Sequence, residues 1–287
     1  VGGGNSASST LYIDNGTWTG LNQFAQLTFT NATGTSATTT SLYTQNINIS
    51  GDTGYQMNGL TLATASTTKN NFFYAGATTT GTNLGTNNIA MGQYALQYAT
   101  SGTENLAFGD WAMSGVSGNG NTGSYNNAFG VLALNLNTSG SSNNAIGKWA
   151  LRSNAIGSEN NALGRNALFS NTSGSDNVGI GYNALLLNTT GSSNNSIGWN
   201  SLSNTTGASS TALGSWAGQT NTTGNNNLYL GDEADALAGT YSNSAAIGSH
   251  AKVGASNSIV LGGTGAWAAN VGIGTTTPWA KLSIQNT

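Results

Sequence analysis

The stretch Asn143-Asn144-Ala145-Ile146-Gly147 decides the fold, because the chain repeats its pattern of polar, small, bulky apolar and glycine residues. The closing glycine returns at spacings of 17, 21, 17, 17, 17, 17, 16, 17, 17, 14 and 12 residues. A near-constant period of this length is typical of proteins in which each repeat is one structural unit stacked on the next. The repeat glycines are Gly92, Gly109, Gly130, Gly147, Gly164, Gly181, Gly198, Gly214, Gly231, Gly248, Gly262 and Gly274.

Composition excludes several classes of function. The chain has 287 residues, of which 5% are charged, with a net charge of −3 and no cysteine. This balance favours neither nucleic acid nor an anionic membrane surface as a partner, and disulfides are excluded. No apolar run approaches the roughly 20 residues of a membrane helix, so we expect no membrane insertion. Because the chain starts at Val1 without Met or a signal peptide, we interpret it as a piece of a longer protein.

Three regions follow from the repeat. Residues 1–84 lack it and contain short runs rich in β-forming residues, at 11–13, 24–29, 42–49, 60–62 and 72–74. We expect a small N-terminal β region there, either a cap or interleaved strands. Residues 85–274 are the repeat array, and residues 275–287 are a C-terminal exit segment.

Each repeat has apolar residues at fixed positions, counted from its glycine as zero. Position −1 is bulky, −2 is mostly small, −4 is Asn or Ser, and +3 is mostly Ala. Position +4 is Leu or Met in the first seven repeats. An Asn-Thr-Ser/Thr-Gly sequence divides many repeats a second time, and we expect its glycine to take positive φ.

These positions predict an all-β fold, a parallel β-roll (a β-solenoid). We expect about twelve short coils of two strands each, stacked about 4.8 Å apart into a rod of roughly 55 Å. Alanine at two positions implies a narrow interior, so the large apolar residues need another surface to cover them. We therefore predict that several rods pack together, with a homotrimer as the closed solution.

The repeats also resemble those of known fibres. Residues 244–251 (SAAIGSHA) and 258–262 (SIVLG) resemble the head repeat of trimeric autotransporter adhesins, and residues 177–185 (NVGIGYNAL) resemble repeats of phage tail fibres. Residues 270–282 (NVGIGTTTPWAKL) are similar to the segment that precedes a C-terminal intramolecular chaperone in such fibres. The resemblance implies a left-handed roll, three chains to a rod, and an extracellular place on a cell surface or virion tail. The 17-residue period departs from the adhesin repeat.

Candidate chemistry is sparse. The chain has one histidine, His250, which we expect to be structural because a lone histidine lacks partners for a catalytic triad or metal site. The Gly179-Ile180-Gly181 run matches the start of a dinucleotide motif, but it recurs with the repeat and is interpreted as a turn. We therefore expect no cofactor and no enzymatic activity.

Two acidic groups are candidates for binding. Glu159 and Asp176 both occupy position −5 of neighbouring repeats, so we expect them to stack about 5 Å apart. Two such carboxylates could share a metal ion or serve as a glycosidase-like pair, whereas the alternative is a solvated turn edge relieved by Lys148 or Arg165. The second group is the cluster at residues 232, 233 and 235, which lacks the spacing of a calcium loop.

Two surface features are candidates for recognition. The first is a set of tryptophans that either bind sugars or are buried between chains: Trp111, Trp149, Trp199 and Trp216. The second is the insertion at residues 117–124, which we expect to bulge from the rod.

The leading hypothesis is a structural, non-enzymatic, homotrimeric fibre for attachment, with a cell-surface glycan or protein as receptor. The alternatives are a polysaccharide-degrading tail spike and an ice-binding solenoid.

Overall fold

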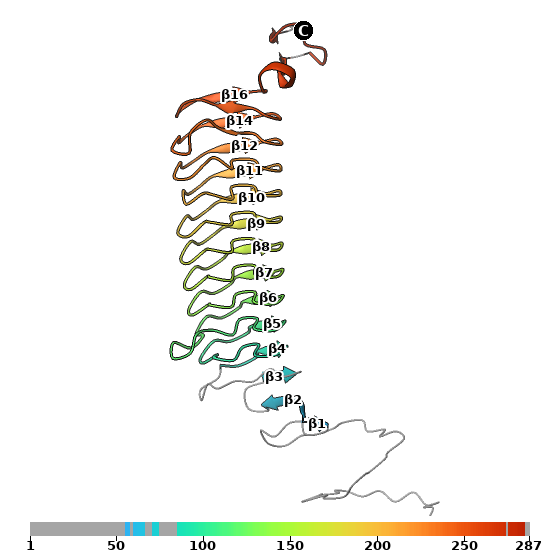
Figure 1. Cartoon of the computed structure of the whole chain (residues 1–287), viewed down its shortest axis with the longest axis vertical. Coiled ribbons are helices and arrows are strands. Elements are labelled where there is room, and N and C mark those ends of the chain that lie inside the picture. The colour runs from blue at the N-terminus through green and yellow to red at the C-terminus, as the bar shows by residue number, and fades with distance from the viewer. Residues whose placement is uncertain (1–54, 58–59, 67–70, 75–84, 274, 285–287) are drawn as a thin grey trace, which may run out of the picture. The chain divides into compact units, whose positions relative to one another are not determined.

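The computed structural model describes residues 55–57, 60–66, 71–74, 85–273 and 275–284, and its main feature is a parallel β-solenoid (Figure 1). Fourteen strands form one sheet in the order β1-β2-β3-β4-β5-β6-β7-β8-β9-β10-β11-β12-β14-β16. From β3 onward every pair in this sheet is parallel and in register, so each turn lies directly over the previous one. The strands of this sheet are β1 (Tyr55–Met57), β2 (Leu60–Ser66), β3 (Asn71–Tyr74), β4 (Ile89–Met91), β5 (Leu106–Phe108), β6 (Asn127–Phe129), β7 (Asn144–Ile146), β8 (Asn161–Leu163), β9 (Val178–Ile180), β10 (Asn195–Ile197), β11 (Thr211–Leu213), β12 (Leu228–Leu230), β14 (Ala245–Ile247) and β16 (Ile259–Leu261).

The all-β prediction is confirmed for the part of the chain that the structure describes. Its only helical element is a single 3₁₀ turn, η1 (Gly265–Trp267). None of the described helical segments has the length and apolarity that crossing a membrane requires. The runs expected at 60–62 and 72–74 lie within β2 and β3, whereas those at 11–13, 24–29 and 42–49 lie outside the described residues.

The prediction of two strands per coil is wrong for most turns. From β4 to β12, each turn has one three-residue strand, and tight turns follow the repeat glycine. In the turn of Gly147, Trp149 and Leu151 have φ values of 67° and 50°, a left-handed conformation that a strand cannot contain. Among the described turns, a second strand occurs only near the end, where β13 (Asp235–Ala236) pairs with β15 (Lys252–Val253).

The interior is as narrow as the alanines predict. Side chains at −2, +3 and +4 point inward, and Ala145, Ala150 and Leu151 are fully buried in one turn. The same three positions are buried in most other turns, which makes one continuous core along the solenoid. Position −1 points outward, and this settles which apolar residues the single chain leaves uncovered.

Buried asparagines tie successive turns together, a role that sequence analysis did not assign. At position −4, the Asn160 side chain donates to the Gly174 carbonyl at 2.9 Å and to Asn143 Oδ1 at 3.1 Å. Its own Oδ1 accepts the Asn177 backbone N–H at 3.1 Å. Because the pattern repeats each turn, these side chains satisfy backbone groups that the interior would otherwise leave unpaired.

The expected Asn-Thr-Ser/Thr-Gly turn is present, but its glycine has another role. Asn171 closes the turn by donating to the Gly174 carbonyl at 2.9 Å. Gly174 is not among the residues with positive φ. A Cβ on Gly174 would instead collide with the Gly191 carbonyl of the next turn, so close stacking requires glycine here.

The solenoid has eleven turns in its sheet instead of the expected twelve. The strand before the twelfth repeat glycine is β17 (Val271–Ile273), which pairs with β18 (Leu282–Ile284) in a separate two-stranded sheet. Residue 274 itself lies outside the described residues. The large sheet therefore ends at β16, and the last repeat has a different environment.

Candidate interaction surfaces

The first candidate surface is the outward side of the long sheet, here called the strand face. It consists of positions −3 and −1 of β4 to β12, β14 and β16, and none of its 22 residues is charged. Ile146 and Leu163 in this face are 45% and 47% exposed. The −1 column of large apolar side chains is Met91, Phe108, Phe129, Ile146, Leu163, Ile180, Ile197, Leu213, Leu230, Ile247 and Leu261.

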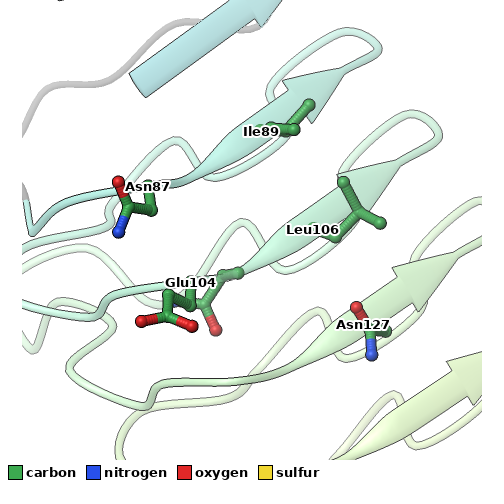
Figure 2. Close-up of a pocket in the computed structure, with 6 residues that line it drawn as sticks. Asn87, Ile89, Glu104, Leu106 and Asn127 are labelled. Atoms are coloured by element: carbon green, nitrogen blue, oxygen red, sulfur yellow. The ribbon is translucent and has the colours of Figure 1, made fainter. Parts of the chain in front are cut away.

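A shallow hollow lies in the strand face near its N-terminal end (Figure 2). Ile89 and Leu106 of the −3 column line it, with Glu104 and Asn87 beside them and Asn127 in the following strand. The hollow is open to solvent and brings together one carboxylate and several amides. This set of side chains contains no nucleophile and no second group to exchange a proton with Glu104, so we describe the hollow as a shallow depression in the strand face.

The second candidate surface lies beyond the repeat glycines and is here called the cation–aromatic edge: Lys148, Trp149, Arg152, Arg165, Phe169 and Tyr182. Lys148 Nζ lies 4.5 Å from the centre of the Trp149 ring. The Arg165 guanidinium lies 5.4 Å from Trp149 and 5.9 Å from Tyr182. Arg152 lies 5.6 Å from Phe169.

Aromatic contacts continue from this edge along the solenoid. Tyr182 and Trp199 have ring centres 6.4 Å apart, and Trp199 and Trp216 are 4.9 Å apart at a steep angle. Tyr182 is 40% exposed and Trp199 is 49% exposed. The four predicted tryptophans therefore do not form one group, because Trp111 instead contacts Tyr94 at 4.4 Å several turns away.

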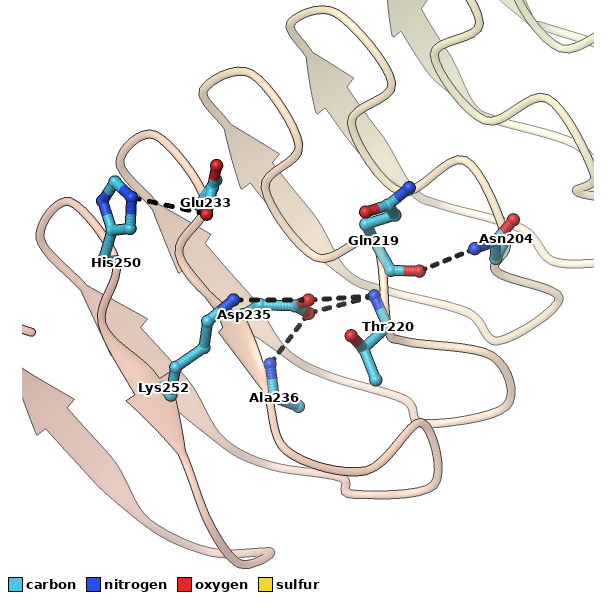
Figure 3. A network of polar contacts seen from close by, with 8 residues as sticks. All are labelled: Asn204, Gln219, Thr220, Glu233, Asp235, Ala236, His250 and Lys252. Atoms are coloured by element: carbon cyan, nitrogen blue, oxygen red, sulfur yellow. Dashed lines mark hydrogen bonds and ion pairs between the residues drawn. The ribbon is translucent and has the colours of Figure 1, made fainter.

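His250 has partners, so the expectation that it lacks them is wrong. Its Nε2 lies 3.4 Å from Glu233 Oε2 (Figure 3). Its Nδ1 lies 2.8 Å from the Ser249 hydroxyl. Its ring stacks on Trp267 at 4.0 Å. Together with Asp232, these side chains offer three possible metal ligands within 4.8 Å of one another. Glu233 and His250 both occupy position +2 of successive turns, and that register is the sequence signal that would have paired them.

The predicted acidic cluster at residues 232, 233 and 235 is divided by the fold. Asp232 and Glu233 are exposed, whereas Asp235 occupies the buried +4 position and is 3% exposed. Asp235 accepts backbone N–H groups of Thr220 and Ala236, and Lys252 Nζ lies 3.8 Å away (Figure 3). Burial raises the pKa of Asp235 above its ordinary value, although Thr220, Ala236 and Lys252 act in the opposite direction.

Glu159 and Asp176 are exposed and occupy matching positions in neighbouring turns, as their spacing predicts. Their shared use as a metal or catalytic pair stays a prediction. The expected relief by Lys148 or Arg165 is wrong, because the ion pairs of the described residues involve only His250 and Lys252. The two cations lie over aromatic rings instead.

The insertion projects less than predicted. Residues 117–119 form an exposed tip, but Asn121 and Gly123 are buried again. Asn121 bridges to Ala99 of the previous turn, and a Cβ on Gly123 would collide with the Gly140 carbonyl. Residues from 121 onward therefore belong to the stack.

The Gly179-Ile180-Gly181 run lies in and just after β9, one turn of the solenoid among many, as its interpretation as a repeat element predicts. Comparison of the chain with protein-family models, with curated proteins and with solved structures gives no match.

Proposed function

We propose that this protein is a non-enzymatic, extracellular fibre protein whose solenoid joins two further copies in a rigid three-chain rod used for attachment. The left-handed winding implied by the resemblance to adhesin heads belongs to the same proposal, as does a place on a cell surface or virion tail. The single observation that carries the proposal is the uncharged strand face, with its unbroken column of large apolar side chains at position −1. Such a face is larger than the scattered apolar residues that monomeric proteins expose, and interface cores are depleted of charge in the same way.

A second copy of the chain fits this face better than an unrelated partner. The −1 column presents one large apolar side chain per turn along all eleven turns of the sheet. A partner that covers it needs the same rise per turn over the same length, and an identical solenoid has both. Completing the burial of a half-exposed Leu or Ile contributes roughly 1 kcal/mol, and the −1 residues that are 37% to 49% exposed number seven, so together they can offset the cost of association.

Rigidity supports the spacer part of the proposal. Each turn is held to the next by backbone bonds in the strand and by the buried asparagines, as for Asn143 and Asn160. Repeat proteins of this kind behave as quasi-one-dimensional stacks, in which every unit contacts only its neighbours. A rod made in this way holds whatever is attached to its ends at a fixed separation.

Analytical ultracentrifugation at micromolar concentration tests the proposal. We expect three chains per particle for the wild type, and dissociation for a Leu163→Lys, Ile197→Lys variant, because two charges per chain would be desolvated in the interface. Leu187→Lys is the matched control, since Leu187 is also 47% exposed but lies outside the strand face. A monomeric wild type would refute the assembly, and dissociation by Leu187→Lys alone would place the interface on another face.

A further inference from the structure

We propose that the cation–aromatic edge binds an acidic polysaccharide, through stacking of sugar rings on its aromatic side chains and pairing of sugar carboxylates with its cations. This proposal names a ligand class for the attachment role proposed above. It rests on that role in one respect, since it requires the cation–aromatic edge to stay outside the contact between the three chains.

The cations of the edge are concentrated and not neutralised by acids. Of six Lys and Arg residues in the chain, Lys148, Arg152 and Arg165 lie in two neighbouring turns. No ion pair within the described ranges involves any of the three. The acidic residues of the same turns, such as Glu159, lie at the other end of the strand, before position −4. The edge is therefore a local positive site on a chain with a net charge of −3.

Stacking leaves the hydrogen-bonding part of Arg165 available. Its guanidinium carbon lies 5.4 Å from the Trp149 ring and 5.9 Å from the Tyr182 ring. These contacts restrain the position of the guanidinium, and its N–H groups can form a bidentate pair with a carboxylate. Arg165 is exposed, so a ligand carboxylate can reach it.

The aromatic rings supply the second half of the recognition. Tyr182, which lies beside Arg165, is 40% exposed, and Trp199 in the turn after Tyr182 extends the row and is 49% exposed. Flat aromatic faces pack well against the apolar faces of sugar rings, and each adds a polar group at its tip. Turns repeat about every 4.8 Å, so the row presents several contacts to an extended polymer that lies along the solenoid.

A uronate polymer fits this site better than single-stranded nucleic acid, the other ligand class that stacks on aromatic rings. Nucleic-acid channels follow the phosphate backbone with an extended positive groove. Here three cations are confined to two turns, and the neighbouring +1 positions are the uncharged Tyr182 and Trp199. The chemistry favours a ligand with occasional carboxylates on a chain of otherwise neutral rings.

Isothermal titration calorimetry with polygalacturonic acid tests the assignment, with its fully methyl-esterified form as the neutral counterpart. We expect the acidic polymer to bind at least tenfold more tightly than the ester. Arg165→Gln should weaken binding at least roughly tenfold through loss of the charged pair, and Trp149→Leu roughly fivefold through loss of the stacked ring. Both variants have precedents that fold, because Gln93 and Leu132 occupy the same positions in other turns.

Trp111→Leu is the matched control, because Trp111 occupies the same +2 position as Trp149 in a turn without the cations. We expect its binding to stay within twofold of the wild type. Unchanged binding by Arg165→Gln, an equal loss in Trp111→Leu, or equal binding of oligothymidylate would overturn the proposal. Ultracentrifugation of the same samples separates the two proposals: a monomeric wild type that binds the polymer supports the ligand assignment and refutes only the three-chain rod.

Discussion

Gly218 and Tyr229 lie in neighbouring turns of the core, where a residue smaller than the repeat consensus faces one that is larger. Two mutations can restore the consensus residues at both positions. Gly218 stands at position +4, where seven turns have Leu or Met, and Tyr229 stands at −2, where most have Ala. Tyr229 is fully buried, and a Cβ on Gly218 would lie 2.5 Å from Tyr229 Cδ2 and 2.7 Å from Leu202 Cδ2. The tyrosine ring therefore fills the space that the missing leucine would occupy.

The two single variants should both be destabilised. Tyr229→Ala leaves a cavity, and truncation of a buried aromatic residue costs about 3–5 kcal/mol. Gly218→Leu overpacks the core against the ring and should cost about 1–3 kcal/mol or more.

The double variant restores the repeat consensus and should recover most of the loss. Leu already occurs at this position with positive φ, for example at Leu202 with φ of 46°, so the backbone at Gly218, with φ of 66°, can accept it. We expect the double variant within about 1 kcal/mol of the wild type, so the coupling free energy should be at least about 3 kcal/mol. Guanidinium unfolding followed by circular dichroism, at one protein concentration, measures all four free energies.

A reciprocal pair elsewhere is the control for this reasoning. Leu151 and Ala162 hold the same two positions, so Leu151→Gly should destabilise and Ala162→Tyr added to it should compensate. If the Gly218→Leu, Tyr229→Ala double variant loses the sum of its single-variant losses, the two positions do not share one space. The description of the core as interchangeable layers would then be refuted.

The remaining predictions concern polar groups. Asn160→Ala should cost about 2–4 kcal/mol of unfolding free energy because it leaves the Asn177 N–H unpaired and removes one of the two side-chain donors to the Gly174 carbonyl, whereas Asn160→Ser should cost less, since a serine at this position can still accept the next turn's N–H. Equal losses of unfolding free energy in the two variants would contradict the role of the buried asparagines in pairing the next turn's N–H. For Asp235, the raised pKa means that its ionised form reduces stability at neutral pH, so its contribution becomes more favourable as the pH falls through that pKa. Asp235→Asn should lack this gain in stability when unfolding free energies are compared between pH 7 and 4. If the variant keeps the pH dependence of the wild type, Asp235 is not its source.

Much of the fold follows from the repeat, and what does not follow has physical reasons. The period predicts stacked parallel strands, and the alanines at −2 and +3 predict the narrow core. The number of strands per turn was not predictable in the same way. Leu151 and Trp149 adopt left-handed φ values although neither residue type favours them, so only the tertiary structure reveals the turns there.

Some features of the candidate sites also follow from repeat position, and others do not. Glu233 and His250 share position +2, and adding one period to the sequence number would have paired them. The separation of Asp235 from Asp232 also follows from position, because +4 is a core position in seven other turns. By contrast, the stacking of Arg165 between Trp149 and Tyr182 depends on side-chain directions at the turn, which the repeat does not encode.

Two outward columns of the same solenoid obey different rules, and the difference bears on both proposals. Position +1 follows the repeat glycine and changes freely between turns, from Asp110 to Val131, Lys148 and Trp199. Position −1 also points outward in the single chain, where its side chain is exposed or half-buried, yet it is large and apolar in all eleven turns of the sheet.

Folding of one chain places no such demand on an outward side chain, because a polar residue at −1 would keep its strand and gain hydration. The −1 column is large and apolar in every turn, whereas the +1 column follows no such rule. A partner that covers the −1 column along its length would impose this difference. The +1 column, free of that requirement, is where charge and aromatic rings can be combined without disturbing the rod.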